Sequence, residues 1–291
     1  MMEILLTITR LSVLVFLVSS MSGIGLSLSL QQVVAPLRNT RLVLFALVAN
    51  FIIAPALALG IGRLLRLDEP FALGLLLLGL AAGAPFMPKI VAVAKGDLAL
   101  AVGLMVLLMV GTTVLLPVAL PQLVEGAQVN PWKIARFLIF LLLLPLVAGL
   151  VVKARLESAA ARLRPVLERV STVSLLMMLA LILAINFKGV LRIFGTGAIL
   201  AAILFAVLSA LAGWLFGGRN AAQRAVLGLG TGLRNIPAAL IVSTQNFKDP
   251  NVSVMVIVTT LVGILLLVPA AKMIGKRALV VLPGTNTPIG N

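Results

Sequence analysis

Gly-Leu-Gly-Thr-Gly-Leu-Arg-Asn-Ile-Pro, residues 228–237, is the stretch that decides the fold, because it places Arg234 inside an otherwise apolar run broken by glycine and proline. An earlier stretch, Gly-Ala-Pro-Phe-Met-Pro-Lys at 83–89, has the same character and ends on Lys89. A charge at the centre of a membrane helix costs about 2.5–3.5 kcal/mol on insertion scales, so such cations are usually buried, hydrated or used. Two fixed cations at two broken apolar segments therefore indicate a transport site.

The composition is that of a polytopic membrane protein. Of the 291 residues, 62% are hydrophobic and 11% are charged, and the mean hydropathy is +1.22. The apolar runs repeatedly exceed the roughly 20 residues that are needed to cross a bilayer. Because these runs and their short loops use nearly the whole chain, we expect one transmembrane domain at 1–280 and a disordered tail at 281–291.

Residue types that are absent, and the way charge is distributed, exclude several function classes. The chain has no cysteine and no histidine, which excludes disulfides, thiolate nucleophiles, iron–sulfur clusters and the usual transition-metal sites. The net charge of +15 comes from Lys and Arg scattered between apolar runs, not gathered on one face with aromatic residues. Membrane topology and anionic lipid explain this charge better than nucleic acid does.

Apolar runs separated by charged, glycine or proline residues predict about nine transmembrane helices. The predicted ranges are 4–31, 40–65, 70–95, 97–122, 131–154, 165–187, 191–217, 221–247 and 250–275. The third and eighth runs are interrupted internally, which a membrane tolerates only where the freed backbone groups are buried in protein or line a watery cavity. The expected fold class is an all-α membrane protein with two discontinuous helices.

A weak internal repeat relates the second to fourth runs to the seventh to ninth. Each unit has an intact helix, a broken helix with a cation at the break, a short charged turn and another intact helix. Two helices lie between the units, and this spacing reverses the side from which the second unit enters the membrane. Discontinuous helices at corresponding positions of inverted halves point to a binding site at the membrane midplane.

The distribution of Lys and Arg between loops predicts the orientation in the membrane. Loops that follow odd-numbered helices, together with the C-terminal end, carry more Lys and Arg than the loops on the other side. Because short cytoplasmic loops are enriched in these residues, we expect an external N-terminus and a cytoplasmic C-terminus. The expected location is a bacterial inner membrane, with the protein as a monomer or a homodimer.

The first break combines helix-breaking residues with a charge. Gly83, Pro85 and Pro88 loosen the helix and remove backbone donors, and Lys89 follows at the start of the second half-helix. We predict that Lys89 contacts the substrate. The alternative is that its ammonium group reaches toward a membrane interface or pairs with a freed carbonyl.

The second break offers more donors than the first. Gly230 and Gly232 allow another backbone to approach, and Pro237 ends the helical pattern. Arg234 and Asn235 supply side-chain donors, a guanidinium fork matches a carboxylate or sulfonate, and half-helix N-termini add positive dipole ends. An organic anion is therefore the expected ligand. The alternative is that Arg234 caps the carbonyls of the broken helices.

Polar residues elsewhere in the apolar runs are further candidates. Asn50 lies in the second helix beside a kinking proline, where its amide faces either the substrate or a neighbouring helix. Thr112 and Thr259, with their neighbours Thr113 and Thr260, lie in the helices that follow the breaks. We predict that these threonines line the cavity, although most membrane threonines bond only their own backbone.

In the order and spacing of its motifs the chain resembles the bile acid:sodium symporter (BASS) family over about residues 15–275. The matching motifs are Met-Ser-Gly-Ile-Gly-Leu-Ser-Leu at 21–28, Asn-Phe-Ile-Ile-Ala-Pro at 50–55, Gly-Ala-Pro at 83–85, Ala-Lys-Gly-Asp-Leu-Ala-Leu-Ala at 94–101 and Gly-Leu-Arg-Asn at 232–235. The resemblance implies a core of two inverted three-helix units, here 40–122 and 191–275, whose broken helices cross at the midplane. It also implies a panel of the other helices, here 4–31 and 131–187.

The resemblance further implies two sodium ions held by a glutamate, glutamines and a Ser-Asn pair, since hard cations require oxygen ligands. In this chain Met87 and Pro88 stand in place of the Ser-Asn pair, and Ala101 and Met105 stand where nearby hydroxyls are implied. Gly230 replaces the glutamate and Arg234 replaces one glutamine. Amide side chains remain at Asn50 and Asn235. A sodium ion beside a guanidinium would meet a repulsion of about 4 kcal/mol at an effective dielectric near 20. We therefore hypothesise that no metal site remains, and that Lys89 and Arg234 are built-in cations in its place.

The predicted function is that of a secondary transporter that moves an organic anion by alternating access, with no requirement for sodium or another cofactor. Bile-acid-like steroids, 2-oxo acids and pantoate-like acids all fit this description. Two alternatives stay open: a sodium-coupled organic anion symporter with a residual site, and a non-transporting receptor-like homologue. An enzyme is not expected, because an intramembrane prenyltransferase needs paired aspartates for magnesium pyrophosphate and the eight acidic residues offer no such pair. The expected partners are a small organic anion and the lipid bilayer.

Overall fold

The computed structural model describes residues 2–124, 131–185, 193 and 195–280, and these residues form helices with no strand among them. The elements in chain order are α1 (Met2–Ser27), α2 (Leu30–Val34), η1 (Ala35–Arg38), α3 (Thr40–Val48), η2 (Ala49–Ile53), α4 (Ala54–Leu64), α5 (Glu69–Leu80), α6 (Met87–Val93), α7 (Leu98–Leu123), α8 (Pro131–Leu138), η3 (Ile139–Leu143), α9 (Leu144–Arg155), α10 (Glu157–Ile185), α12 (Ala198–Phe216), α13 (Ala221–Gly232), α14 (Ile236–Asn246) and α15 (Pro250–Val280). A helix satisfies its own backbone hydrogen bonds, as an apolar chain in a bilayer requires. The predicted all-α membrane fold is confirmed.

The number of membrane-spanning helices differs from the predicted nine. Seven helices in the described part of the chain are long and apolar enough to span a membrane, namely Thr7–Ser27, Thr40–Leu64, Leu98–Leu123, Ile134–Arg155, Ala198–Phe216, Ala221–Asn246 and Pro250–Arg277. The predicted span at 70–95 is divided between α5 and α6, so neither half is long enough. The described part of the predicted span at 165–187 belongs to α10, which ends at Ile185 and whose first turns carry several charged residues.

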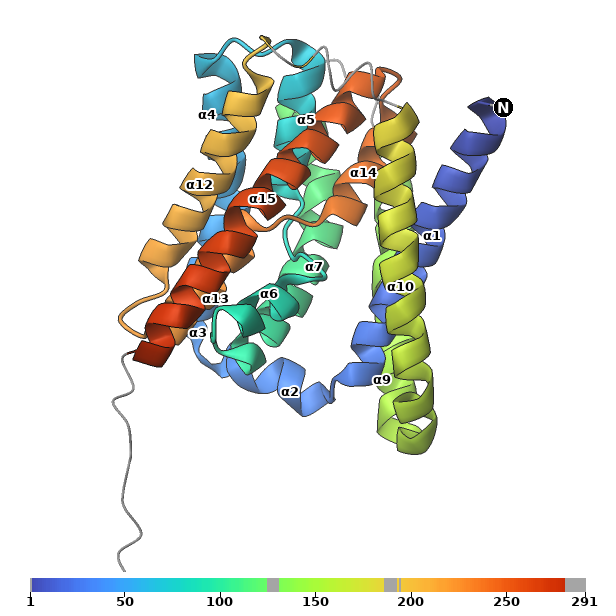
Figure 1. Ribbon diagram of the computed structural model, residues 1–291, viewed down its shortest axis with the longest axis vertical. Helices are drawn as coiled ribbons and strands as arrows, with labels where there is room; N and C mark the ends of the chain where they lie inside the picture. Colours follow the sequence, from blue (N-terminus) through green and yellow to red (C-terminus); the bar gives the residue numbers. More distant parts are fainter. Residues whose placement is uncertain (1, 125–130, 186–192, 194, 281–291) are drawn as a thin grey trace, which may run out of the picture.

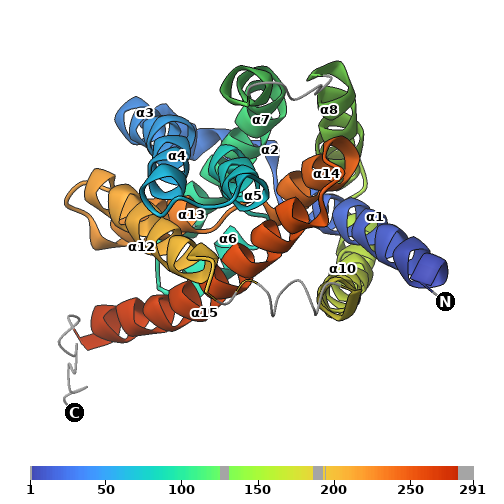
Figure 2. The same ribbon diagram turned by 90° about the horizontal axis from the view of Figure 1, so that it is seen from above.

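Two groups of helices are visible in Figures 1 and 2. On one side α1 packs along both α9 and α10. On the other side α4, α5, α12, α13 and α15 pack against one another, and α6 packs against α13 and α15. Helix α7 contacts both groups, since it packs against α5 and α13 and also against α8 and η3, which continue into α9. The division into core and panel, the inverted repeat and the orientation in the membrane stay predictions, and the tail at 281–291 lies outside the described residues.

Two helices contain a π-helical turn shortly before a proline. The turn Ala49–Ile53 comes before Pro55, and the turn Ile139–Leu143 comes before Pro145. Proline has no N–H, and its ring collides with the carbonyl group four residues earlier, so the helix widens at that point. The widened turn at 49–53 contains Asn50, which is buried.

Two helices stop inside the bundle and resume after a short non-helical segment, as Figure 1 shows for α5 and α6. The interruptions cover residues 81–86 and 233–235. In the first, Gly83 has a φ of +81°, a left-handed conformation that strongly favours glycine. Pro88 and Pro237 lie in the first turn of the helix that resumes, where a missing N–H breaks no helical hydrogen bond.

Candidate functional site

The two interruptions are hydrogen-bonded to each other inside the bundle. The backbone N–H of Asn235 donates to the carbonyl oxygen of Ala81 at 2.8 Å. Asn235 also caps α14, because its Oδ1 accepts from the N–H of Ala238 at 3.1 Å. Two segments that are distant in the sequence therefore form a single buried site.

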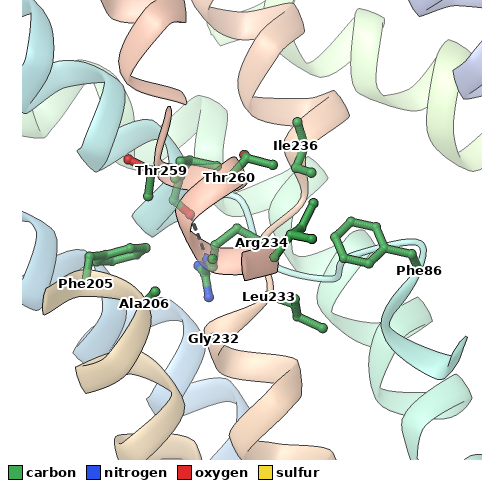
Figure 3. A pocket seen from close by; sticks show the side chains of 12 residues that line it. Phe86, Phe205, Ala206, Gly232, Leu233, Arg234, Ile236, Thr259 and Thr260 are labelled. Atoms are coloured by element: carbon green, nitrogen blue, oxygen red, sulfur yellow. Dashed lines mark hydrogen bonds between the residues drawn. The ribbon is translucent and has the colours of Figure 1, made fainter. Parts of the chain in front are cut away.

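Arg234 lies between the interruptions, and only 5% of its surface is exposed. Its Nε donates to the Leu78 carbonyl at 2.8 Å, and its Nη1 donates to Asn50 Oδ1 at 2.8 Å and to the Thr231 carbonyl at 3.1 Å. Its Nη2 donates to the carbonyl of Gly79 and, at 3.4 Å, to the carbonyl of Asn50. A guanidinium has five N–H groups, so these five bonds fill its capacity. Figure 3 shows the side chain among its neighbours.

The positive charge of Arg234 is balanced by carbonyl groups. Within the described residues no carboxylate pairs with it. The Leu78 and Gly79 carbonyls belong to the last turn of α5, where helical partners are missing and the negative end of the helix dipole lies. This geometry agrees with the alternative that Arg234 caps a broken helix, since direct contact with a substrate would require one of the five bonds to be exchanged.

Asn50 connects the π-helical turn to the second broken helix. Its Nδ2 donates to the Ala46 carbonyl at 2.9 Å and to Thr231 Oγ1 at 3.1 Å, while its Oδ1 accepts from Arg234. Only 2% of its surface is exposed. Both ends of the amide are thus engaged with the protein, and Thr231 is a member of this network that the sequence analysis did not single out.

Thr112 holds the other side of the first interruption. Its Oγ1 donates to the Ala82 carbonyl at 3.0 Å and accepts from the Ala82 N–H at 2.9 Å, so one hydroxyl satisfies both backbone groups of a residue outside any helix. The neighbouring Thr113 bonds the Met109 carbonyl of its own helix at 2.9 Å. Both threonines are buried, and neither lines either of the two cavities described below.

Apolar side chains fill the positions where the resemblance implies sodium ligands. Met87, Ala101 and Met105 are all completely buried. A Cβ atom added to Gly230 would lie 2.5 Å from Met87 Cε and 3.0 Å from Met87 Sδ. The methionine side chain therefore occupies the space that a larger residue at position 230 would need, and its thioether is a poor ligand for a hard cation.

Thr259 and Thr260 border a small cavity of about 20 Å³ together with Arg234, Phe205 and Phe86, as Figure 3 shows. The two threonine hydroxyls are buried and have no hydrogen-bond partner in the described part of the protein. A cavity of this volume holds about one water molecule. These hydroxyls thus border the same space as the buried cation, but the space is too small for an organic substrate, and a role of the threonines in binding stays a prediction.

Lys89 lies away from this network, on a larger cavity of about 200 Å³. The cavity is bordered by α1, the first interruption, α6, α7 and α10, and Pro85 and Pro88 lie on its wall. Lys89 is exposed and makes no hydrogen bond or ion pair with any described residue. The sequence analysis treated Lys89 and Arg234 alike, but their surroundings differ. Lys89 has no partner among the described residues, whereas all five N–H groups of the Arg234 guanidinium are hydrogen-bonded.

The wall of the larger cavity includes residues that sequence reasoning missed. They are Ser19, Ser20 and Ser27 of α1, and Arg164, Glu168, Ser171 and Thr172 of α10. Of the three serines of α1, only Ser27 falls in a motif quoted in the sequence analysis, the one at 21–28, where it carried the family resemblance and no site prediction. The charges of α10 gave no distinct signal, because charges near the end of a membrane helix are common.

A polytopic helical membrane protein in which two interrupted helices meet at a buried polar site has an architecture that is typical of secondary transporters. Comparison with known proteins identifies the family: residues 14–193 match the model of the Sodium Bile acid symporter family. The chain belongs to this family, which confirms the resemblance, and the family is one of transporters, not enzymes.

Three named relatives are similar to parts of the chain. "Uncharacterized sodium-dependent transporter YocS" of Bacillus subtilis is 27% identical over 183 residues, which are 61% of this chain and 56% of that protein. "Probable sodium/metabolite cotransporter BASS1, chloroplastic" of Arabidopsis thaliana is 22% identical over 81% of this chain and 60% of that protein. "Probable sodium/metabolite cotransporter BASS6, chloroplastic", also of Arabidopsis thaliana, is 24% identical over 83% of this chain and 62% of that protein. The chain therefore spans less than two thirds of the length of these relatives.

Proposed function

We propose that the chain is a secondary transporter that moves a small organic anion by alternating access, and that it does so without sodium. The observation that carries the proposal is Arg234, whose guanidinium is hydrogen-bonded within the site where the two interruptions meet. A broken helix leaves carbonyl groups without partners, and these groups attract a cation. In this chain a side chain supplies that cation permanently.

Two contacts support the proposal that this chain has no sodium-binding site. Nη1 of Arg234 bonds the Asn50 amide oxygen, at a position where the resemblance implies a sodium ligand, and Met87 packs over Gly230, where it implies the glutamate. A sodium ion about 4 Å from the guanidinium would be repelled by about 4 kcal/mol at an effective dielectric of 20. The carbonyl oxygens around Arg234 are also already engaged as acceptors, so few oxygen ligands are left to replace the hydration shell of an ion.

The larger cavity is the proposed substrate site. It lies between the two groups of helices and carries Lys89, a cation with no partner among the described residues. In this proposal the helices of 40–122 and 191–275 move relative to those of 4–31 and 131–187 and expose the cavity to each side of the membrane in turn. The chain sits in a bacterial inner membrane with its N-terminus outside and carries a single transmembrane domain. Arg234 stabilises the junction of the broken helices and does not itself bind the anion.

Uptake into proteoliposomes tests the proposal. The purified chain is reconstituted, and uptake of radiolabelled 2-oxobutyrate, pantoate and taurocholate is measured with sodium, with potassium and with N-methylglucamine as the external cation. The expected result is uptake of at least one of these acids above that of protein-free vesicles, with the same initial rate in all three cations. Strict dependence on sodium would refute the built-in cation, and no uptake of any acid would refute the transport function.

A sodium-coupled symporter is the second candidate, and the printed names of the relatives favour it. In that case the remaining amides at Asn50 and Asn235 would contribute to a residual sodium site. Asn235 Nδ2 is buried and has no partner among the described residues, but it is a donor and therefore does not attract a cation. The cation substitution described above separates the two candidates, because only the symporter loses uptake in potassium.

A further inference from the structure

The larger cavity contains charge from both groups of helices. Lys89 at the start of α6 contributes one cation, and α10 contributes Arg164 and Glu168, which lie one turn apart on the same helix face. The Nε of Arg164 donates to Glu168 Oε1 at 2.8 Å. No other charged side chain lines this cavity in the described part of the protein, so its formal charge is +1.

The ion pair on α10 is of a kind that opens easily. The two side chains are 50% and 41% exposed, and exposed pairs at this spacing contribute little to stability. Only one nitrogen of the Arg164 guanidinium is bonded to Glu168, which leaves the other donors free to bind a second carboxylate. Glu168 therefore holds the Arg164 guanidinium at the cavity wall and leaves its other N–H groups available to a ligand.

We infer that Arg164 is a second anchor for the substrate, opposite Lys89, and that Glu168 occupies this guanidinium while the cavity is empty. On binding, the carboxylate of the substrate shares or replaces the contact with Glu168 and also faces Lys89. This inference rests on the proposed transport function. It adds a determinant of specificity from the helix group that does not carry the interruptions.

Size, charge and hydroxyl groups define the class of substrate. A cavity of about 200 Å³ is smaller than the roughly 300–1,000 Å³ typical of sites for drug-sized ligands, so its size favours a small acid over a steroid. The net charge of +1 matches a monoanion. Ser20 of α1 and Ser171 of α10 lie on the wall, and their hydroxyls make no hydrogen bond to any described residue. The expected substrate is a small monocarboxylate that carries hydroxyl or oxo groups.

Removal of the internal carboxylate gives the sharpest test. In proteoliposomes the initial rate of uptake of 2-oxobutyrate and pantoate is measured as a function of concentration for the unmodified protein, Glu168→Gln, Arg164→Gln and the double variant. Glu157→Gln is the matched control, because Lys153 and Glu157 form the same kind of pair at 2.6 Å outside the cavity.

The inference predicts opposite effects of the two single variants. Glu168→Gln is expected to lower KM about twofold, because the carboxylate of this exposed pair no longer competes with the substrate, and Arg164→Gln is expected to raise KM at least as much. In the double variant KM is expected to rise as in Arg164→Gln alone, because Glu168 acts only through Arg164. The control variant is expected to match the unmodified protein.

The outcomes separate this inference from the proposed function. If the unmodified protein transports either acid but Glu168→Gln leaves KM unchanged or raises it, the role of Arg164 is refuted and the transport function stands. A fall in KM with Glu157→Gln equal to that with Glu168→Gln also refutes it, because the effect is then one of general surface charge. If the unmodified protein transports neither acid, both the proposed substrate class and the role of Arg164 are refuted. If it then transports taurocholate, the proposed transport function still stands.

Discussion

Arg234→Gln is the substitution with the largest predicted effect on stability. The guanidinium makes five hydrogen bonds to buried acceptors, and a glutamine amide has two N–H groups, so at least three bonds are lost. A hydrogen bond to a charged group contributes about 1.5–3 kcal/mol, but the variant no longer has to bury a charge, which offsets part of the loss. The expected net destabilisation is about 3–5 kcal/mol.

Thermal unfolding of the purified protein in detergent measures this effect. Arg219→Gln is the control, because Arg219 is exposed and makes no hydrogen bond to any described residue. We expect Arg234→Gln to lower the melting temperature by at least about 6 °C and the control to change it by no more than about 1 °C. Equal melting temperatures for Arg234→Gln and the unmodified protein would refute the reasoning, because the arginine would then not hold the interruptions together.

Sodium provides a second measurement on the same variant. With the guanidinium removed, the carbonyl oxygens of Leu78, Gly79 and Thr231 surround an uncharged amide, and such oxygens suit a hard cation. A sodium ion that binds with a Kd near 15 mM would stabilise the variant by about 1.4 kcal/mol at 150 mM. We therefore expect sodium, relative to potassium, to raise the melting temperature of Arg234→Gln and to leave that of the unmodified protein unchanged. Stabilisation of the unmodified protein by sodium would contradict the proposal.

Three other substitutions test separate parts of the site. Lys89→Gln is expected to change the melting temperature little, because Lys89 is exposed and unpaired among the described residues. The same variant is expected to raise the KM for anion uptake about tenfold, and an unchanged KM would show that Lys89 is not part of the substrate site. Gly83→Ala is expected to lower the free energy of unfolding by about 2–4 kcal/mol, because Gly83 has a φ of +81° and the new Cβ would lie 2.6 Å from the Met109 nitrogen. Thermal unfolding at the temperature of the unmodified protein would show that the segment can relax. Thr112→Val is expected to cost about 2–3 kcal/mol, because both backbone groups of Ala82 lose their partner; a change below about 0.5 kcal/mol would show that water replaces the hydroxyl.

The positions of the two interruptions were predictable from the sequence because their causes are local. Glycine and proline act on the backbone of their own turn, so the breaks fall beside Gly83 and before Pro237, as their residue types require. The all-α membrane fold was predictable for a similar reason, since long apolar runs in lipid have few other ways to satisfy their backbone. The count of spans was less predictable, because it depends on the length left on each side of a break.

The partners within the site were not predictable, because they join distant parts of the chain. Asn50 and Arg234 are separated by 184 positions, and the sequence contains no signal for the direction in which each side chain points. The packing of Met87 over Gly230 is likewise a long-range contact between two residues that are individually unremarkable in an apolar sequence. Arg164 and Glu168 lie in the charged first half of α10, and only the folded arrangement brings them to the same cavity as Lys89.

The cation at the junction of the broken helices is a covalently attached side chain, Arg234, and this determines which energy source can drive the transport cycle. A sodium ion can leave on one side of a membrane, so its gradient can drive transport, whereas the guanidinium of Arg234 stays in place and takes nothing from an ion gradient. Under the proposed function, net flux then follows the concentration of the anion and the membrane potential, which acts on one elementary charge with about 2.3 kcal/mol per 100 mV. Because the interior of a bacterial cell is negative, this potential favours the export of a monoanion over its uptake.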